Sequence, residues 1–582
     1  MTFERVGAVT HATHRDALDT GAPALGAVAD MLQSAAARGA AVADAVTGFE
    51  ISEQSGPGHA IARVTTGVTA FVGRALKGPV DTPVTIHGFA EYVRIFGGLW
   101  QPSTMSYALE QYFENGGRTA IVVRVANGAR PPTLTLPAGA APLTLVGLAP
   151  GSREYLRASV DYDGIGDNED DRFNLVVQRL RTPGSERIEE QEIFRRLSVQ
   201  PDSDRYVANV LTDSRLVRVR GDVPGARPER TPSRVASLMV GYVASNPDGD
   251  DGAPLTDYDL IGSTQRGSGL FALRGAPHFD LLCVPPLTRT DDVGLATLTV
   301  ASRLCRDRHA MLVVDPPAAW STAAVAMDAL RPWPFRSEQA VMYFPRVLAL
   351  DRVRGRYEVF ASCGAAAGLI ARGDAASPLW GARETDEPVL RPTLRTAVAL
   401  EDNERARLAQ LGVNTFTTVR PLQRRSSSPR TLGAGGSGPA DWTWLAARRL
   451  ALFILASVEE GTRWIVFQHD RPEAWARLRA QVEAFLAGLE DEGAFVGRTS
   501  AERWFVICDA RLNPPESLAA GQVNLLLGFA LTHAGDFHAF LVTHRAGASS
   551  VRPVSVNRLA TSGERVEEEI ETSILQGIAL DS

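Results

Sequence analysis

Hydrophobic residues near the start of the chain follow two different periods. Between residues 22 and 45, apolar side chains recur at helical spacing within an alanine-rich stretch, at Leu25, Val28, Leu32 and Ala35. Over residues 47–52 the pattern changes to alternation, which places Phe49 and Ile51 on one face. We expect a helix and then one short strand that has no sequence-adjacent strand to pair with.

The next part of the sequence contains a mixed unit and a stretch of short strands. Residues 64–125 alternate between apolar strands and a helix at residues 107–115, which Gly116 is placed to end. After Pro131, short alternating segments are separated by glycine, aspartate and proline turns, as at residues 173–177, 205–211 and 216–219. We interpret residues 131–235 as an inserted β-rich domain.

Apolar strands and helical patterns alternate again through residues 255–400. Strands are predicted at residues 281–284, 311–314 and 341–344, and this alternation indicates a mainly parallel α/β sheet. Further on, Asp470 and Pro472 open a helix whose apolar stripe begins at Trp475 and which Gly493 ends. The last part of the chain predicts an amphipathic helix that requires a partner surface, because apolar residues recur among glutamates at Val566, Ile570, Ile574 and Ile578.

Composition narrows the class of protein. A chain of 582 residues is long enough for several buried cores, and its 45% hydrophobic and 22% charged residues are typical of a soluble globular protein. No apolar run approaches the roughly 18 residues of a membrane span, and the first residues lack the apolar core of a signal peptide. Four cysteines without Cys-x-x-Cys spacing favour a reducing cytoplasm. A net charge of −7 without a long basic stripe argues against a nucleic-acid partner.

The basic residues are almost all arginine, since Lys77 is the only lysine. Codon usage in a GC-rich genome accounts for this bias most simply. The functional alternative is that the planar guanidinium suits interfaces in which carboxylate pairs break and form again. Either way, a phosphate-binding or Schiff-base lysine is available only at Lys77, which lies in a Lys-Gly-Pro turn.

Four short motifs suggest ligand chemistry, and each has a plainer interpretation. Residues 433–438 match Gly-x-Gly-x-x-Gly but lie in the polar loop 424–440 instead of after an apolar strand, which favours a linker over a phosphate cradle. The acidic stretches 248–252 and 167–171 lack the ligand spacing of a calcium loop. No carboxylate or cysteine completes a metal set with His533, His538 and His544. We therefore predict no cofactor and no metal.

Two blocks of the sequence, with a third region between them, resemble contractile tail sheath proteins in the order of that family. The C-terminal block contains Asp441-Trp442-Thr443-Trp444, Arg448-Arg449-Leu450, Gly461-Thr462-Arg463-Trp464-Ile465-Val466-Phe467, Trp475, Phe485-Leu486, Gly493-Ala494-Phe495-Val496-Gly497, Trp504-Phe505-Val506, Asn513-Pro514, Gly521 and Ala534-Gly535-Asp536-Phe537. The N-terminal block contains Gly67-Val68-Thr69-Ala70-Phe71-Val72-Gly73-Arg74, Lys77-Gly78-Pro79, Phe96-Gly97-Gly98, Phe113-Glu114-Asn115-Gly116-Gly117 and Val123-Arg124-Val125. The central matches are Gly269-Leu270-Phe271-Ala272-Leu273, Leu281-Leu282-Cys283-Val284-Pro285 and Gly368-Leu369-Ile370-Ala371-Arg372-Gly373-Asp374. The resemblance spans roughly residues 47–545.

The sequence departs from the family at two loops. The family usually has a Pro-Ala-Glu-Phe element where this chain has residues 534–537, and a Pro-Pro-Ser-Gly loop where it has residues 361–364. The two ends of the chain, residues 1–46 and 546–582, lie outside the resemblance.

The resemblance implies a multidomain α/β fold. It consists of a sheath-type core with N-terminal and C-terminal α+β parts, a subtilisin-like α/β central domain and the inserted β-rich domain. The expected boundaries are an N-terminal extension at 1–46, the N-terminal part at 47–130, the insertion at 131–235, the central domain at 236–400, the C-terminal domain at 401–545 and a C-terminal arm at 546–582.

The resemblance also implies a mechanical function without enzymatic activity. Sheath subunits form stacked hexameric rings around an inner tube and contract to drive that tube through a target envelope. The implied partners are other copies of this chain, the inner tube protein, and the baseplate and tail terminator or cap proteins, with no nucleic acid and no membrane insertion. The implied location is the cytoplasm of the producing bacterium and then the assembled phage tail or injection particle.

Two sets of residues are candidates for the contacts of such a subunit. An unpaired strand gains backbone hydrogen bonds by joining the sheet of another molecule, so we expect inter-subunit strands at Gly48, Phe49, Glu50 and Ile51 and at Val551, Val554 and Val556. The family places a charged helix of the C-terminal domain against the tube. Arg477 and Arg479 are the candidates for this contact, although an ordinary solvated helix face explains them equally well.

Two other functions are alternatives. A hydrolase would use the central subtilisin-like domain, but the sequence contains neither a Gly-x-Ser-x-Gly elbow nor a subtilisin-type Gly-Thr-Ser-Met-Ala segment. A surface adhesin built from β modules would require a secretion signal, and the first residues do not have one.

Overall fold

The computed structural model describes residues 60–184, 187–232, 241–381, 389–416, 429–434, 440–468 and 471–554. The helix predicted at 22–45, the strand at 47–52 and the helix around Val566–Ile578 lie outside these residues.

The centre of the described chain is a seven-stranded sheet. Its strand order is β17-β13-β12-β11-β1-β3-β2, and all neighbours are parallel except β2, which runs antiparallel to β3. In this order the strands are Val413–Thr415, Ala340–Phe344, Met311–Val314, Leu281–Cys283, Val68–Gly73, Thr119–Arg124 and Val84–Ile86. The strands predicted at 281–284, 311–314 and 341–344 are therefore present and parallel. Strands from residues 68–124 and from residues 281–415 share this one sheet.

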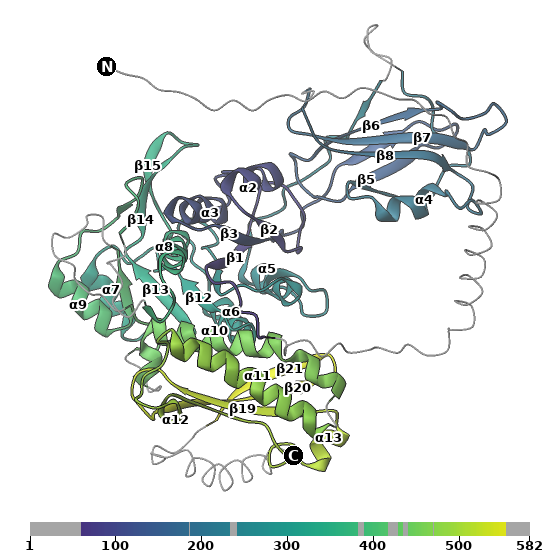
Figure 1. Cartoon of the computed structure of the whole chain (residues 1–582). Coiled ribbons are helices and arrows are strands. Elements are labelled where there is room, and N and C mark those ends of the chain that lie inside the picture. Colours follow the sequence, from purple (N-terminus) through teal and green to yellow (C-terminus); the bar gives the residue numbers. More distant parts are fainter. Residues whose placement is uncertain are drawn as a thin grey trace, which may run out of the picture. The chain divides into compact units, whose positions relative to one another are not determined.

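Helices cover both faces of the sheet (Figure 1). In β1, Phe71 points into one core while Ala70 and Val72 point into the other, because side chains alternate along a strand. The first face carries α2 (Phe89–Phe96), α3 (Thr104–Asn115) and α8 (Cys363–Ala376). The second face carries α5 (Asp257–Ile261), η2 (Gly269–Gly275), α6 (Leu295–Asp307), α7 (Ala323–Leu330) and α9 (Asp402–Gln410). Burial on both faces explains why every residue of β1 is apolar or small.

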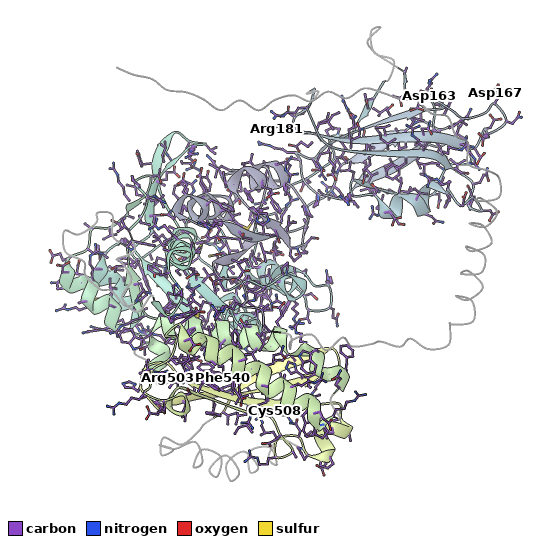
Figure 2. All side chains as sticks on the ribbon, viewed as in Figure 1. Asp163, Asp167, Arg181, Arg503, Cys508 and Phe540 are labelled. Atoms are coloured by element: carbon purple, nitrogen blue, oxygen red, sulfur yellow. The ribbon has the colours of Figure 1, made fainter. Side chains whose placement is uncertain are left out.

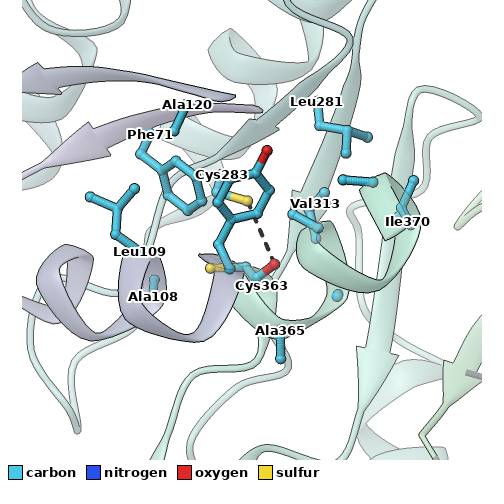
Figure 3. Close-up of a cluster of buried hydrophobic side chains, with 14 of the residues drawn as sticks. Phe71, Ala108, Leu109, Ala120, Leu281, Cys283, Val313, Cys363, Ala365 and Ile370 are labelled. Carbon is cyan, nitrogen blue, oxygen red and sulfur yellow. Dashed lines mark hydrogen bonds between the residues drawn. The ribbon is translucent and has the colours of Figure 1, made fainter. Parts of the chain in front are cut away.

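Helices α3 and α8 approach closely on the first face. The Ser103 hydroxyl caps α3 by accepting from the Ser106 amide at 3.0 Å, and Gly116 ends the helix at a φ of 119°, as predicted. A Cβ added at Gly364 of α8 would lie 1.9 Å from the Ala108 carbonyl oxygen of α3. The same core holds the Cys283 thiol, which donates to the Cys363 carbonyl at 3.7 Å (Figure 3).

The β-rich stretch between β3 and β11 contains two antiparallel sheets with a shared core. One has the order β4-β5-β9 and the other β10-β6-β7-β8. The strands are β4 Thr133–Leu136, β5 Leu143–Gly147, β6 Tyr155–Asp161, β7 Arg172–Leu180, β8 Ile188–Ser198, β9 Val217–Val219 and β10 Val243–Ala244. The strand predicted at 205–211 was wrong, because this segment forms α4 (Val207–Val210) and η1 (Leu211–Asp213). Val207 and Leu211 are fully buried at an i, i+4 spacing, which is helical.

The C-terminal part places two helices on an antiparallel sheet of order β18-β19-β20-β21. The helices are α10 (Leu445–Gly461) and α11 (Pro472–Asp491), and α11 buries the predicted stripe from Trp475 to Leu489. The strands are Trp504–Ile507, Val523–Ala530, Phe537–Arg545 and Ala548–Val554. Short helices η4 (Ala440–Thr443), η5 (Arg463–Gln468), α12 (Ser500–Arg503) and α13 (Pro515–Ala519) connect them. A separate small sheet, β15-β14-β16, comprises Arg356–Phe360, Val347–Asp351 and Arg395–Thr396.

Candidate functional site

A buried ionic joint connects α10 to the amino ends of the central parallel strands. Arg449 of α10 donates to Asp374 of α8 at 2.5 and 2.6 Å and to Asp280, which directly precedes β11, at 2.6 Å. The side chains of Arg449 and Asp374 are both 8% exposed, and that of Asp280 is 13% exposed. Burial raises the pKa of Asp280 to about 6, although Arg449 opposes this shift. Burial opposes the charge of Arg449, but Asp374 and Asp280 outweigh it and raise the pKa of the guanidinium.

Two more contacts extend this joint along the same edge. Arg448 donates to Gln339, which precedes β13, at 2.6 Å. His309, close to the start of β12, lies 2.7 Å from the Glu459 carboxylate of α10. Helix α10 therefore crosses the amino ends of β11, β12 and β13 and is fixed to each of them.

A small cavity lies beside the joint and is lined by His278, Asp280, His309 and Arg449, among others. Burial lowers the pKa of His278 to about 4, and Arg308 and His309 lower it further. The ring is therefore neutral at pH 7. A single arginine between two carboxylates can hold together elements that are far apart in the sequence.

The carboxyl ends of the parallel strands, where open α/β sheets usually bind ligands, hold structural contacts. Asp315, just after β12, accepts from the Ser362 and Cys363 amides at the start of α8, at 2.6 and 2.7 Å. Arg346 pairs with Asp292, and Arg289 donates to Asp351 at 2.6 Å. Among the described residues at this edge, no hydrogen bond joins a serine, threonine or cysteine to a histidine.

Loops at the same edge attach the β-rich stretch. Lys77, between β1 and β2, pairs with Glu189 of β8 at 2.5 Å, and the two side chains are 9% and 13% exposed. Arg124 at the end of β3 is 1% exposed and donates to the carbonyls of Ala75 and Gly78. Burial lowers the pKa of this guanidinium to about 10. The only lysine thus has a structural contact in a dry site.

The acidic stretches make hydrogen bonds within the protein. Asp248 accepts from the Thr133 amide and hydroxyl at 2.9 and 2.6 Å, and Asp251 accepts from the Ser152 amide and hydroxyl at 2.7 and 2.8 Å. The stretch 167–171 belongs to the loop between β6 and β7, where Figure 2 labels Asp163 and Asp167. Within the part of the chain that the structure describes, no group of three histidine, cysteine, aspartate or glutamate residues has the geometry of a metal site.

The three histidines have separate partners. The ring of His538 packs on Trp442, with ring centroids 4.0 Å apart, while His533 lies 3.2 Å from the Thr532 hydroxyl. His544 lies 2.8 Å from both the Thr462 and the Ser549 hydroxyls. Burial lowers the pKa of His544 to about 4. The structure does not bring the three rings to one site.

The described contact candidates lie on the C-terminal sheet and helices. Val551 and Val554 belong to β21, which pairs with β20 and forms one edge of its sheet. Arg477 and Arg479 lie on the exposed side of α11; Arg477 contacts Gln468 and the Trp464 ring, and Arg479 pairs with Glu483 at 2.7 Å. Residues 48–51 and Val556 lie outside the described residues, as do residues 435–438 of the glycine-rich string.

Sequence reasoning did not assign a role to the residues of the ionic joint. A signal was present, since Arg448-Arg449 interrupts a long apolar helix and stands within the resemblance. Their partners Asp280 and Asp374 are distant in sequence, so only the fold could identify the joint.

Among the described residues, no helix has the length and apolar content required to cross a membrane.

The described chain is a multi-sheet α/β protein whose buried polar groups hold its elements together. Its architecture is that of tail sheath proteins. The structure resembles a sheath tail protein from Listeria innocua with a TM-score of 0.55 and 14% identity, over 84% of this chain and 97% of that one. A sheath tail protein from Desulfitobacterium hafniense matches with a TM-score of 0.46 and 14% identity, over 87% of this chain and 99% of that one. The contracted sheath complex of the extracellular contractile injection system PVC matches with a TM-score of 0.48 and 13% identity, over 84% and 95%.

Searches by sequence give no further relative. No protein-family model matches the chain, and no curated protein matches it. The Listeria innocua match confirms the prediction of a sheath-protein fold, and at 14% identity it establishes the fold alone.

Proposed function

We propose that this protein is the structural subunit of a contractile sheath, which polymerises as stacked hexameric rings around an inner tube and contracts to drive the tube through a target envelope. The observation that carries the proposal is the fold match to a sheath tail protein over 97% of that protein's length. Because the match also extends over 84% of this chain, the likeness is not confined to one common domain.

The C-terminal sheet has the geometry to join neighbouring copies. Strands β18 and β21 form its two edges, and an edge strand can pair with a strand from another chain. In the proposal, residues 48–51 supply one such strand, and Val551, Val554 and Val556 belong to the other contact. Contacts of this kind join two different surfaces, and they build a helical filament when the rotation does not close.

The ionic joint supports a contraction in which each subunit keeps its internal structure. Arg449, Asp374 and Asp280 are buried together, so separating α10 from the central sheet would expose or strand three charges. Rearrangement between subunits costs less than rearrangement within one. In the proposal, contraction therefore moves rigid subunits past one another, and its energy comes from the lattice without any nucleotide.

The remaining partners follow from the same role. The exposed side of α11, with Arg477 and Arg479, faces the inner tube, and baseplate and tail terminator or cap proteins close the two ends of the sheath. The protein is made in the bacterial cytoplasm and becomes part of a phage tail or injection particle. It acts without enzymatic activity, nucleic acid or membrane insertion, and no observation on the described residues favours the hydrolase alternative.

Negative-stain electron microscopy tests the proposal. We expect the full chain, expressed with the genes next to its own, to form hollow cylinders of stacked rings. Monomers that persist in the presence of a tube protein would contradict the sheath function. Expression of the chain without these genes separates self-assembly from assembly on a tube.

A further inference from the structure

One face of the β14–β15 hairpin is apolar and exposed. In the register of this pair, Leu350 is opposite Tyr357 and Leu348 is opposite Val359, so all four side chains share the face. Leu350, Tyr357 and Val359 are 46%, 58% and 45% exposed, and Val353 in the turn is 51% exposed. Single exposed apolar residues are ordinary, but a contiguous set on one strand pair marks an interaction surface. We call these five residues the hairpin face.

The opposite face anchors the hairpin in the protein. Val347 and Phe360 are buried in the core of the first sheet face, and Asp351 accepts from Tyr107 at 3.1 Å and from Arg289 at 2.6 Å. Because this side is fixed by buried contacts, the hairpin face is a preformed surface.

Arginines surround the hairpin face. The turn reads Arg352-Val353-Arg354-Gly355-Arg356, with three arginines and no carboxylate. Arg352 pairs with Glu110 and Glu114 of α3, and Arg289 pairs with Asp351, whereas Arg354 and Arg356 share Glu358, which Arg289 also contacts. Arg395 of β16 lies opposite Leu348, and its guanidinium is 6.0 Å from the Tyr357 ring centroid. The surface therefore combines an apolar centre with excess positive charge.

A complementary segment exists in the same chain. Residues 564–578 place Val566, Ile570, Ile574 and Ile578 at four-residue steps, which aligns them on one side of a helix. Between the first two lie Glu567, Glu568 and Glu569, and Glu571 follows. An apolar stripe beside clustered glutamates matches an apolar face beside arginines in both hydrophobicity and charge.

We propose that the hairpin face is the docking site of the acidic C-terminal segment, residues 564–578. The apolar stripe of the segment covers the hairpin face, and its glutamates meet Arg354 in the turn and Arg395 beside Leu348. This inference goes beyond the sheath function, since docking does not require rings or a tube.

A second pair of exposed apolar residues supplies a control site. Ile188 and Ile193 of β8 are 42% and 53% exposed, but Glu189, Glu190 and Glu192 lie between them in the sequence. Glu189 and Glu190 are paired with Lys77 and Arg179, so Ile193 provides a control site with a similar exposed fraction and without an excess of unshared arginines.

Site-directed disulfide formation in the full chain tests the proposal. The four native cysteines are buried, so introduced surface cysteines react selectively. We compare Tyr357→Cys with Ile570→Cys against Ile193→Cys with Ile570→Cys under mild oxidation. The hairpin pair is expected to cross-link at least about tenfold faster, and 1 M salt is expected to reduce its rate. A product within one chain or between two chains supports docking and identifies the copy that supplies the segment.

Equal cross-linking rates for the two pairs would overturn the proposal. A second variant tests the charge argument in the same assay, with Glu567, Glu568, Glu569 and Glu571 all changed to arginine. In this variant, the cysteines at positions 357 and 570 are expected to cross-link only slightly faster than those at positions 193 and 570. An unchanged cross-linking rate would contradict the assigned role of the arginines. The assay uses unassembled protein, so its result is separate from the microscopy of cylinders.

Discussion

Arg449 joins α10 to the central sheet through two buried carboxylates. Arg449→Met leaves the carboxylates of Asp280 and Asp374 buried without a counter-ion. Removing one partner of a buried ion pair destabilises proteins by about 3–5 kcal/mol, so we expect a loss of this size in denaturant unfolding.

Two controls separate charge burial from a general effect of the substitution. Arg479→Met removes an exposed i, i+4 pair with Glu483, and such pairs contribute only about 0.3–0.5 kcal/mol. The triple variant Asp280→Leu, Asp374→Leu, Arg449→Met removes all the charges and is expected to recover much of the loss. A single variant as stable as the native protein contradicts the role of the joint.

His544 makes stability depend on pH. Burial lowers its pKa to about 4 in the folded protein, whereas an unfolded histidine titrates near 6.5. The unfolded chain therefore binds more protons between these values, and stability falls as the pH decreases from about 6.5 to 4. His278 has the same sign, while the raised pKa of Asp280 has the opposite sign.

We therefore expect His544→Gln to lose less thermal stability than the native protein between pH 6.5 and pH 4.5. Thermal melts across this range check it, with the exposed His533→Gln as the control. If the melting temperature of His544→Gln falls with decreasing pH as steeply as that of the native protein, His544 contributes nothing to the pH dependence of stability.

At the scale of elements, the contact between α3 and α8 depends on the absence of a side chain at one position. A Cβ at Gly364 would lie 1.9 Å from a backbone oxygen of α3, which cannot move without the helix. Gly364→Ala is expected to destabilise the protein by about 1–3 kcal/mol, the range for overpacked cores.

The same helix supplies the control for this substitution. Gly373 has no atom within 4 Å of an added Cβ, and Gly373→Ala is expected to stabilise the protein by about 0.5–1 kcal/mol through helix propensity. Denaturant unfolding of both variants checks the pair, and equal effects would mean that the close approach of α3 and α8 is unimportant.

Local signals predicted elements well where they were strong. Gly116 correctly predicted the end of α3, and Pro472 with a periodic apolar stripe correctly predicted α11. The segment 205–211 was misread because a pattern of few residues does not separate a strand from one helical turn. The pairing of β1 with β11 and the partners of Arg449, which are 75 and 169 positions away, join residues far apart in the sequence, and no local pattern carries that information.

At the scale of the whole molecule, we expect one deletion to prevent assembly without affecting folding. Deleting residues 48–51 removes the strand proposed to join a neighbouring sheet and leaves the described domains intact. We expect a folded monomer, with unchanged circular dichroism and melting temperature, that forms no cylinders in electron microscopy. Deletion of residues 11–14 from the same extension is the control, and cylinders from the 48–51 deletion would contradict the assignment.

Lys77, which is buried in its ion pair with Glu189, decides how the folded protein reacts with amine reagents. Because the only lysine is dry and ion-paired, amine-reactive dyes and aldehyde fixatives find no reactive lysine on the described surface of the folded protein. Such reagents are directed to the α-amino group of the chain. In a mixed particle, amine labelling therefore marks the lysine-bearing partners of this protein and leaves its own body unlabelled.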